Sequence, residues 1–294
     1  MRVGVFGGSG FLGSHVADEL TKFGHQVLIF DKKESPYIQG HQKFIKGDLL
    51  NKDDVESFVS KCDVIYNFAG FADLNASISD PEKTLSLNVM GTLNILESCR
   101  KHESLKRFVY ASSAYVFSDK GSFYGISKRC SEQLVEEYHR EWGLNYSIIR
   151  YGSVYGPRAD SQNRVYRIVK QALEEKKIEF NGDGSEEREY IHVRDAAKLS
   201  VELLESNDFL NQHVILTGVE RFKYKDLLLM IQEMLQGNVE LKMLNQDYKG
   251  HYNLTPYTFL PKPGKKLVSN SFVDIGQGLL EVMNDLYVEK TNTP

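Results

Sequence analysis

A glycine-rich turn near the start of the chain constrains its fold more than any other stretch. Arg2–Phe6 reads as a short apolar strand, Gly7, Gly10 and Gly13 mark the turn, and Ser14–Phe23 takes helical spacing. Backbone N–H groups at a helix N-terminus are unpaired, and the helix dipole favours negative charge, so the arrangement predicts an anion site. The G-x-x-G-x-x-G spacing is a variant of the G-x-G-x-x-G pattern that binds dinucleotides.

The next strand ends on a carboxylate that makes the cofactor more specific. Gln26–Phe30 reads as the second strand and leads directly into Asp31. A carboxylate at this position accepts hydrogen bonds from ribose hydroxyls and repels a 2′-phosphate. The pattern therefore predicts NAD as the cofactor, while Lys32 and Lys33 leave NADP open.

Composition limits the remaining possibilities. The chain has 294 residues and a net charge of −4, which fits one large domain or two small ones and gives no basic block for nucleic acid. Its three cysteines are scattered, and no apolar run reaches about 18 residues, so we expect a cytoplasmic protein that does not interact with a membrane. The eight histidines show no ligand spacing, and no metal site is predicted.

Strands alternate with helices along the first half of the chain, which predicts a parallel sheet covered on both faces. Further strands are expected at 44–46, 63–67, 107–111 and 145–150, with the last of them closing the sheet. Helices are expected at 51–60, 81–102, 125–142 and 164–177. The predicted fold class is α/β, a Rossmann-type doubly wound parallel sheet with a smaller α/β substrate-binding lobe. We assign residues 1–150 to the sheet domain and 151–294 mainly to the lobe, with segments near 183–217 crossing back.

Three side chains form the predicted reaction centre. Ser113 follows the strand at 107–111, and Tyr124 and Lys128 lie one helical turn apart on one face of the next helix. A free tyrosine has a pKa near ~10, and a neighbouring ammonium would stabilise its phenolate. Ser113 can hydrogen-bond a substrate oxygen. The trio therefore suits proton removal from an alcohol during its oxidation by NAD.

With these residues the sequence resembles the extended short-chain dehydrogenase/reductase family, in its nucleotide-sugar branch. The motifs are G-G-S-G-F-L-G at 7–13, G-D-L at 47–49, N-F-A-G at 67–70, L-N-V-M-G-T at 87–92, A-S-S-A at 111–114, Y-G-I-S-K at 124–128, R-Y-G-S-V-Y-G-P-R at 150–158 and G-D-G-S-E-E-R-E-Y-I-H-V-R-D at 182–195. The resemblance implies that the catalytic residues are Ser113, Tyr124 and Lys128. It implies that NAD is lined by Gly7, Gly10, Phe11, Leu12, Asp31, Asp48, Leu49, Phe68, Ala69, Asn88, Tyr124, Lys128 and Tyr151.

Within this branch the chain looks most like a UDP-hexose 4-epimerase. Dehydratases of the branch carry an acidic pair after the Ser or Thr that follows the strand expected here at 107–111, where this chain has Ala114, and decarboxylases have a Glu near Tyr115. The resemblance then implies that Tyr124 removes the C4 hydroxyl proton and a transient 4-keto sugar turns over in the pocket. The alternatives are a reductase or dehydrogenase acting on a 4-keto nucleotide sugar, and a dinucleotide-sensing module without turnover.

The resemblance also implies contacts to the substrate. Arg188 would meet the diphosphate, because a guanidinium matches phosphate oxygens, or it would instead pair at the surface with Glu186 or Glu187. Ser153 stands where the family usually has Asn, and Lys262 where it has Arg. Ser271 falls near the position that gates sugar size.

Three further expectations concern Asp48, one loop and two helices. Asp48 is either a ligand of the cofactor or an acid at the N-terminus of the helix at 51–60. The loop at 116–123 is shorter than the family's, so the pocket would be more open or the substrate different. Helices 82–102 and 125–142 would pair in a homodimer, or be buried within one chain.

Overall fold

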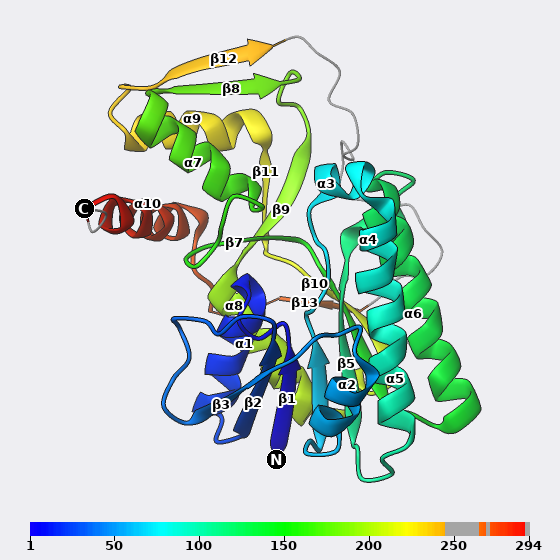
Figure 1. The fold of residues 1–294 in the computed structure, drawn as a ribbon. Coiled ribbons are helices and arrows are strands. Elements are labelled where there is room, and N and C mark those ends of the chain that lie inside the picture. The colour runs from blue at the N-terminus through cyan, green and yellow to red at the C-terminus, as the bar shows by residue number, and fades with distance from the viewer. Residues whose placement is uncertain (245–264, 269–270, 292–294) are drawn as a thin grey trace.

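The computed structural model describes residues 1–244, 265–268 and 271–291, and a parallel eight-stranded sheet forms the base of this part of the chain (Figure 1). The strands are β1 (Arg2–Phe6), β2 (Gln26–Asp31), β3 (Gln42–Lys46), β4 (Val64–Asn67), β5 (Arg107–Ser113), β6 (Tyr146–Tyr151), β10 (Gln212–Leu216) and β13 (Lys265–Leu267). Their order is β13-β10-β6-β5-β4-β1-β2-β3. The predicted doubly wound fold is confirmed.

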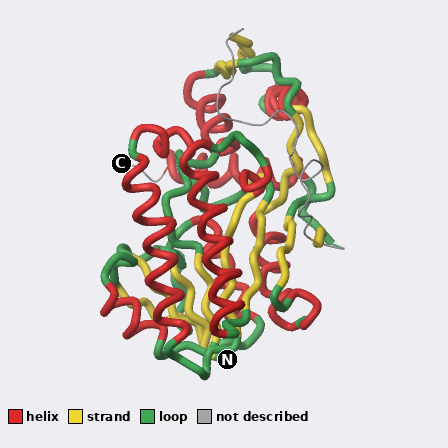
Figure 2. Tube along the Cα trace, turned by 90° about the vertical axis from the view of Figure 1, so that its right-hand side faces the viewer, coloured by secondary structure: helices red, strands yellow, loops and turns green. Residues whose placement is uncertain are grey.

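Helices cover both faces of the sheet because its strands are apolar on both sides. Val3 and Val5 of β1 face a core shared with α1 (Phe11–Lys22) and α8 (Val193–Glu205). Phe6 faces the opposite core. That second core is shared with the helices α2 (Lys52–Val59), α5 (Gly91–Arg100) and α6 (Ser122–Trp142). Figure 2 views the molecule from this second side, where the long helices lie in front of the strands.

The expected strand at 145–150 does not close the sheet, and that prediction was wrong. β10 pairs with the outer edge of β6, and β13 pairs with β10 in turn. Both additional strands are short and come from the second half of the chain, so no local pattern connected them to the first six. The chain therefore returns to the sheet twice after leaving it.

The expected long helix at 81–102 is three segments. These are α4 (Pro81–Leu85), a π-helical turn η1 (Ser86–Met90) and α5, which ends at Arg100. A π turn inserts one residue into the helix and re-aims the side chains after it. Here the turn contains Asn88, whose side chain is buried. Leu74–Ser79 forms a separate short helix, α3, before Asp80 and Pro81 begin α4.

A smaller lobe lies beyond the carboxyl ends of the parallel strands (Figure 1). Its strands are β7 (Ser153–Tyr155), β9 (Glu187–His192) and β11 (Glu220–Lys223) in one sheet, and β8 (Lys177–Asn181) and β12 (Glu240–Leu244) in another. Its helices are α7 (Arg164–Glu175), α9 (Tyr224–Met234) and α10 (Ile275–Thr291). Together they enclose a third hydrophobic core. The helix expected at 164–177 ends earlier because Lys176, directly before β8, takes a left-handed conformation, φ 54°.

Short 3-10 turns connect the remaining elements. η2 (Ala114–Phe117) follows β5, and η3 (Asn207–Phe209) precedes β10. No helix in the described ranges is long and apolar enough to cross a membrane.

Candidate active site

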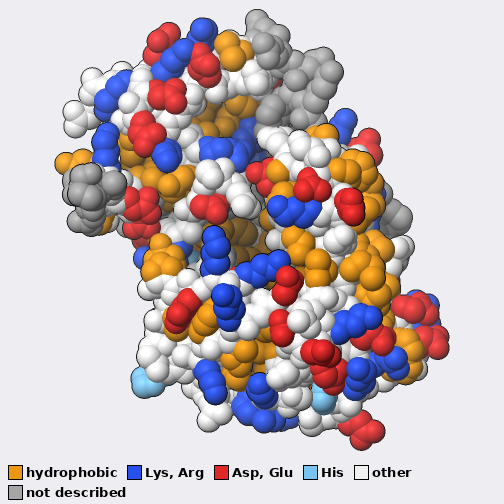
Figure 3. All heavy atoms as spheres, viewed as in Figure 1, with side chains coloured by type: hydrophobic (Ala, Val, Ile, Leu, Met, Phe, Trp, Pro, Cys, Tyr) orange, Lys and Arg blue, Asp and Glu red, His pale blue; other side chains and the backbone are white. Residues whose placement is uncertain are grey.

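A large cavity separates the sheet from the lobe, and its volume is about 530 Å³. Figure 3 shows the molecule hollowed at this place, with Lys and Arg side chains around the hollow. Most of the predicted site residues line this one cavity. They are Gly7, Gly10, Phe11, Leu12, Phe68, Ser113, Tyr124, Lys128, Tyr151, Ser153 and Arg188. The glycine turn, the predicted trio and the lobe therefore face one space.

The glycine turn forms a cradle that side chains would fill. Gly7 has φ +73°, and a Cβ there would lie 2.6 Å from the backbone nitrogen of Ala69. A Cβ on Gly13 would lie 2.2 Å from the carbonyl oxygen of Gly7. Gly10 caps α1 without any side-chain hydrogen bond, and the first turn of α1 carries no acidic residue. The turn thus keeps a helix N-terminus open toward the cavity, which suits the pyrophosphate of a dinucleotide.

Asp31 lies beside this turn, at the end of β2. Its Oδ2 accepts a hydrogen bond of 3.2 Å from the backbone N–H of Ser9, and it does not line the cavity. Lys32, one of the two lysines that left NADP open, forms an ion pair of 3.1 Å with Asp48. That pairing directs one positive charge away from Asp31.

Asp48 and Leu49 lie outside the cavity. The backbone N–H of Leu50 and the ammonium of Lys32 lower the pKa of Asp48. Leu49 is buried in the core on the α5 side of the sheet, where a Cβ on Gly91 would collide with it. Both residues have structural contacts beside the turn, and their contact with NAD stays a prediction.

The three predicted catalytic residues come from β5 and α6. Ser113 ends β5, and its Oγ accepts a 3.3 Å hydrogen bond from the N–H of Tyr115. The Lys128 ammonium donates to the carbonyl oxygen of Ala111 at 2.8 Å and lies 5.8 Å from the ring centroid of Tyr124. Burial lowers the pKa of Lys128 to about 8, against the opposing influence of Glu132.

A buried ion pair joins α6, the helix that carries Tyr124 and Lys128, to strand β6 of the sheet. Nη2 of Arg150, on β6, lies 2.6 Å from Oε2 of Glu132, and both side chains are buried. The hydroxyl of Ser112 donates to Glu132 at 2.5 Å. Because Glu132 is one helical turn after Lys128, the pair fixes the helix face that carries the ammonium.

Asn88 contributes to the site without lining the cavity. Its Oδ1 accepts from the N–H of Phe71 at 2.6 Å, and its Nδ2 donates to the carbonyl oxygen of Phe71 at 3.0 Å and to Ser127 Oγ at 2.8 Å. The Ser127 hydroxyl donates to the carbonyl oxygen of Tyr124 at 2.8 Å. Asn88 therefore connects the loop at Phe71 to the turn of α6 that holds Tyr124.

Several cavity residues had no motif to reveal them. They are Ala72, Asp73, Leu74 and Asn75 before and in α3, Tyr115 in η2, and Asp160, Gln162, Asn163, Arg164 and Arg167 on the lobe. The pattern R-x-x-R at the start of α7 was the one available signal, because it places two guanidinium groups near Arg188. Arg164 stacks 3.7 Å from the ring centroid of Tyr224 and pairs with Glu186 at 3.0 Å.

The remaining predicted residues lie as follows. Arg188 is buried, and its Nη1 donates to the carbonyl oxygen of Glu187 at 3.0 Å. Tyr151 bonds Ser200 Oγ at 2.6 Å, and burial raises its pKa. Ala69 donates its N–H to Asn67 and is not part of the cavity wall. Ser271 does not line the cavity, and Lys262 lies outside the described residues.

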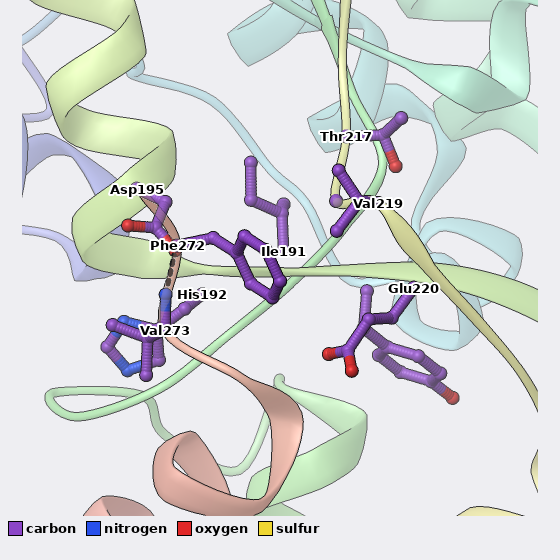
Figure 4. Close-up of a pocket in the computed structure, with 10 residues that line it drawn as sticks. Ile191, His192, Asp195, Thr217, Val219, Glu220, Phe272 and Val273 are labelled. Atoms are coloured by element: carbon purple, nitrogen blue, oxygen red, sulfur yellow. Dashed lines mark hydrogen bonds between the residues drawn. The ribbon is translucent and has the colours of Figure 1, made fainter. Parts of the chain in front are cut away.

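A second cavity lies under the lobe and is far smaller, with a volume of about 10 Å³ (Figure 4). Two of the residues that line it are hydrogen-bonded to each other: the backbone N–H of Val273 donates to Oδ2 of Asp195 over 2.8 Å. This volume holds about one water molecule, so it is no substrate site. No group of His, Cys, Asp and Glu among the described residues is arranged to hold a metal ion.

Comparison with known proteins identifies the family of the chain. The model of the NAD dependent epimerase/dehydratase family matches residues 3–218. The chain belongs to this family, and it is an NAD-dependent enzyme of its nucleotide-sugar branch. The resemblance drawn from the motifs is confirmed at this level.

The relatives are named for different activities, some as 4-epimerases and others as decarboxylases. A protein of Methanocaldococcus jannaschii provisionally named UDP-glucose 4-epimerase is 31% identical over 70% of this chain and 75% of its own. A UDP-N-acetyl-alpha-D-glucosaminuronate decarboxylase of Bacillus cytotoxicus is 29% identical over 89% of this chain and 87% of its own. A mutant UDP-glucuronic acid 4-epimerase of Bacillus cereus, solved with NAD and a fluorinated UDP-sugar, superimposes with a TM-score of 0.86. It is 25% identical and covers 98% of this chain and 100% of its own.

Proposed function

We propose that the protein inverts the C4 hydroxyl of a nucleotide sugar, with a UDP-hexose as the favoured substrate and Tyr124 as the acid/base. The observation that carries the proposal is the convergence of Ser113, Tyr124 and Lys128 on the same cavity as the glycine turn. When bound, NAD supplies the reversible two-electron oxidation of the C4 alcohol. The turn at residues 7–13 would hold its pyrophosphate, and Asp31 its adenosine ribose.

The chain's own side chains then handle the proton. Tyr124 takes the proton from the C4 hydroxyl and returns it after the 4-keto sugar has turned over. Lys128 is buried, so little water surrounds its ammonium. The attraction between this ammonium and the phenolate of Tyr124 is therefore stronger than it would be in water. Ser113 donates a hydrogen bond to the C4 oxygen and holds it beside the phenol.

The lobe supplies the positive charge that a diphosphate needs. Arg164, Arg167 and Arg188 line the lobe side of the cavity, and guanidinium groups match phosphate oxygens. Glu186 offsets part of this charge through its pair with Arg164. We propose that Arg188 and Arg167 face the diphosphate, with Ser153 near the sugar; Lys262 stays a predicted contact.

Proton NMR of the reaction mixture tests the proposal. The NAD-loaded enzyme is incubated with UDP-glucose, UDP-N-acetylglucosamine and UDP-glucuronate in turn, and the anomeric signals of the C4 epimers are followed. Conversion of at least one substrate to its C4 epimer, without net NADH formation, supports the assignment. Absence of inversion with every sugar nucleotide, from enzyme that retains bound NAD, would refute it.

Decarboxylation is the second candidate, because relatives with that name match much of the chain. It uses the same oxidation at C4 but then releases carbon dioxide from a uronate. Tyr115 stands where the family's decarboxylases carry Glu, which favours epimerisation. The same NMR experiment separates the two activities, since decarboxylation yields a UDP-pentose. A reductase acting on a 4-keto sugar would instead consume exchangeable cofactor and give denatured enzyme without retained NAD.

We further propose a homodimer formed by the helices of α4–α5 and α6. Several large apolar side chains on this side are about half exposed, among them Met90, Ile126 and Trp142. Apolar groups of this size at neighbouring helices are typical of a covered surface. Light scattering of the purified protein tests it, with Met90→Glu as the disruptive variant. The cytoplasmic location stays a prediction.

A further inference from the structure

Asp73 places a negative charge on the reaction side of the cavity. Asp73 lines the same cavity as Ser113 and Tyr124. It is the N-cap of α3, and its Oδ1 accepts a hydrogen bond of 2.9 Å from the N–H of Ala76. The cap fixes the orientation of the carboxylate.

The position of Asp73 relative to Tyr124 is set by the Asn88 bridge. Asn88 binds both backbone groups of Phe71, two residues before Asp73, and also binds Ser127, three residues after Tyr124. This short chain of hydrogen bonds couples the 71–75 loop to the N-terminal turn of α6. A sugar whose C4 hydroxyl reaches Tyr124 therefore lies next to this loop.

The other charged side chains of the cavity are distributed unevenly. The three arginines come from α7 and β9 of the lobe, and Asp160 precedes α7 in the same lobe. Lys128 is on the reaction side, but its ammonium is buried and donates to Ala111. Lys83 lies 4.9 Å from the ring centroid of Phe71 and is not part of the cavity wall. The diphosphate is thus drawn toward the lobe, while the sugar faces a carboxylate.

We infer that Asp73 is a specificity residue that selects nucleotide sugars with an uncharged hexose over nucleotide uronates. This inference rests on the proposed function and narrows its substrate class. A uronate carries a carboxylate on C5 of the ring, so binding it beside Asp73 brings two like charges together in a partly dehydrated space. An uncharged hexose has hydroxyl groups there that donate hydrogen bonds to the Asp73 carboxylate.

The test compares UDP-glucose with UDP-glucuronate, which share the diphosphate and differ at C6. Dissociation constants and kcat/KM are measured for the wild type and for Asp73→Asn, which keeps an oxygen for the cap. The control is Asp80→Asn, because Asp80 caps α4 in the same way, at 3.0 Å from the N–H of Lys83, and lies outside the cavity. The wild type should prefer UDP-glucose, and Asp73→Asn should reduce the preference at least about tenfold. The control should keep the wild-type ratio.

Salt provides a second measurement that needs no variant. Raising ionic strength screens the repulsion at Asp73, so the binding preference of the wild type for UDP-glucose should shrink as salt rises. The shared diphosphate contributes equally to both ligands and cancels in the ratio. A wild type that prefers UDP-glucuronate, or a ratio unchanged by both salt and Asp73→Asn, overturns the inference. Binding selectivity without any C4 inversion would refute the proposed reaction and leave the inference standing.

Discussion

The ammonium of Lys128 donates a hydrogen bond of 2.8 Å to the carbonyl oxygen of Ala111, one strand position before the Ser112–Ser113 pair. The bond joins the helix that carries Tyr124 to the strand that carries Ser113. With the hydrogen bond from Ser112 to Glu132, it holds the three proposed catalytic groups on one contact surface between β5 and α6.

Activity should depend on the charge of this ammonium. Burial lowers the pKa of Lys128 to about 8, so the ammonium is present below that pH and is lost as the pH rises through it. We expect kcat to fall on the alkaline side near pH 8 in the wild type. Lys128→Met should lose most of its turnover and show no such limb in its residual rate. A wild-type profile that stays flat to pH 10 would contradict the assigned role of the ammonium.

The same residue should destabilise the folded protein. Its folded pKa of about 8 is below the unfolded value of 10.5, so the unfolded state binds the proton more tightly. The resulting loss of folding free energy is fully present below pH 8 and becomes smaller as the pH rises toward 10.5. Lys128→Met should therefore raise the free energy of unfolding at pH 7, by on the order of 2 kcal/mol, and by less at pH 10. Urea unfolding at the two pH values measures this difference.

Tyr124→Phe should remove the acid/base and leave cofactor binding intact. General acid–base groups contribute roughly 10²- to 10⁴-fold to the reaction rate, so turnover should fall at least about 10²-fold. The variant keeps the ring, which lies edge-on to Tyr115 with centroids 6.3 Å apart. NAD content after purification should match the wild type, and Tyr115→Phe serves as the control for loss of a phenol in the same cavity. Wild-type turnover in Tyr124→Phe would refute the assigned base.

Gly13→Ala should prevent NAD binding, because the new Cβ would lie 2.2 Å from the carbonyl oxygen of Gly7. The turn must shift to make room, and its backbone N–H groups then no longer point toward the position proposed for the pyrophosphate. Gly40→Ala is the matched control, since a Cβ there meets nothing within 4 Å and its backbone is not left-handed. Calorimetric titration with NAD should show binding in the control and none in Gly13→Ala. Equal affinities in the two variants would contradict the cradle.

Asp31→Ser should weaken the preference for NAD over NADP. Removing the carboxylate deletes both the proposed ribose contact and the repulsion of a 2′-phosphate, and Lys33 remains nearby to attract one. The ratio of the two dissociation constants should move toward NADP by about tenfold or more. Lys32→Ala tests the opposite side, because Lys32 is paired with Asp48 and its loss should change the ratio little. An unchanged ratio in Asp31→Ser would count against this residue as the discriminator.

The sequence predicted the parts of the fold that repeat a local pattern. The strand–turn–helix at residues 2–23, the carboxylate of Asp31 and the Tyr124–Lys128 pair each depend on neighbours within a few positions. The strands β7 and β9 of the lobe were missed because they lie inside motifs that were interpreted as binding sites, and β7 has only three residues. The role of Asn88 as a bridge depends on a π turn, and Asp73 reaches the cavity through contacts that no spacing encodes.

Because the chain returns twice to the large sheet, the enzyme cannot be cut at one point into a cofactor-binding half and a substrate-binding half. β10 and β13 cover the outer edge of β6, and both are encoded after the first lobe strand. A protein truncated after residue 151 would leave the backbone groups of β6 open to pairing with another chain, and aggregation would compete with folding. Recombination between family members therefore has to exchange discontinuous pieces, because no single crossover point separates the cofactor half from the substrate half.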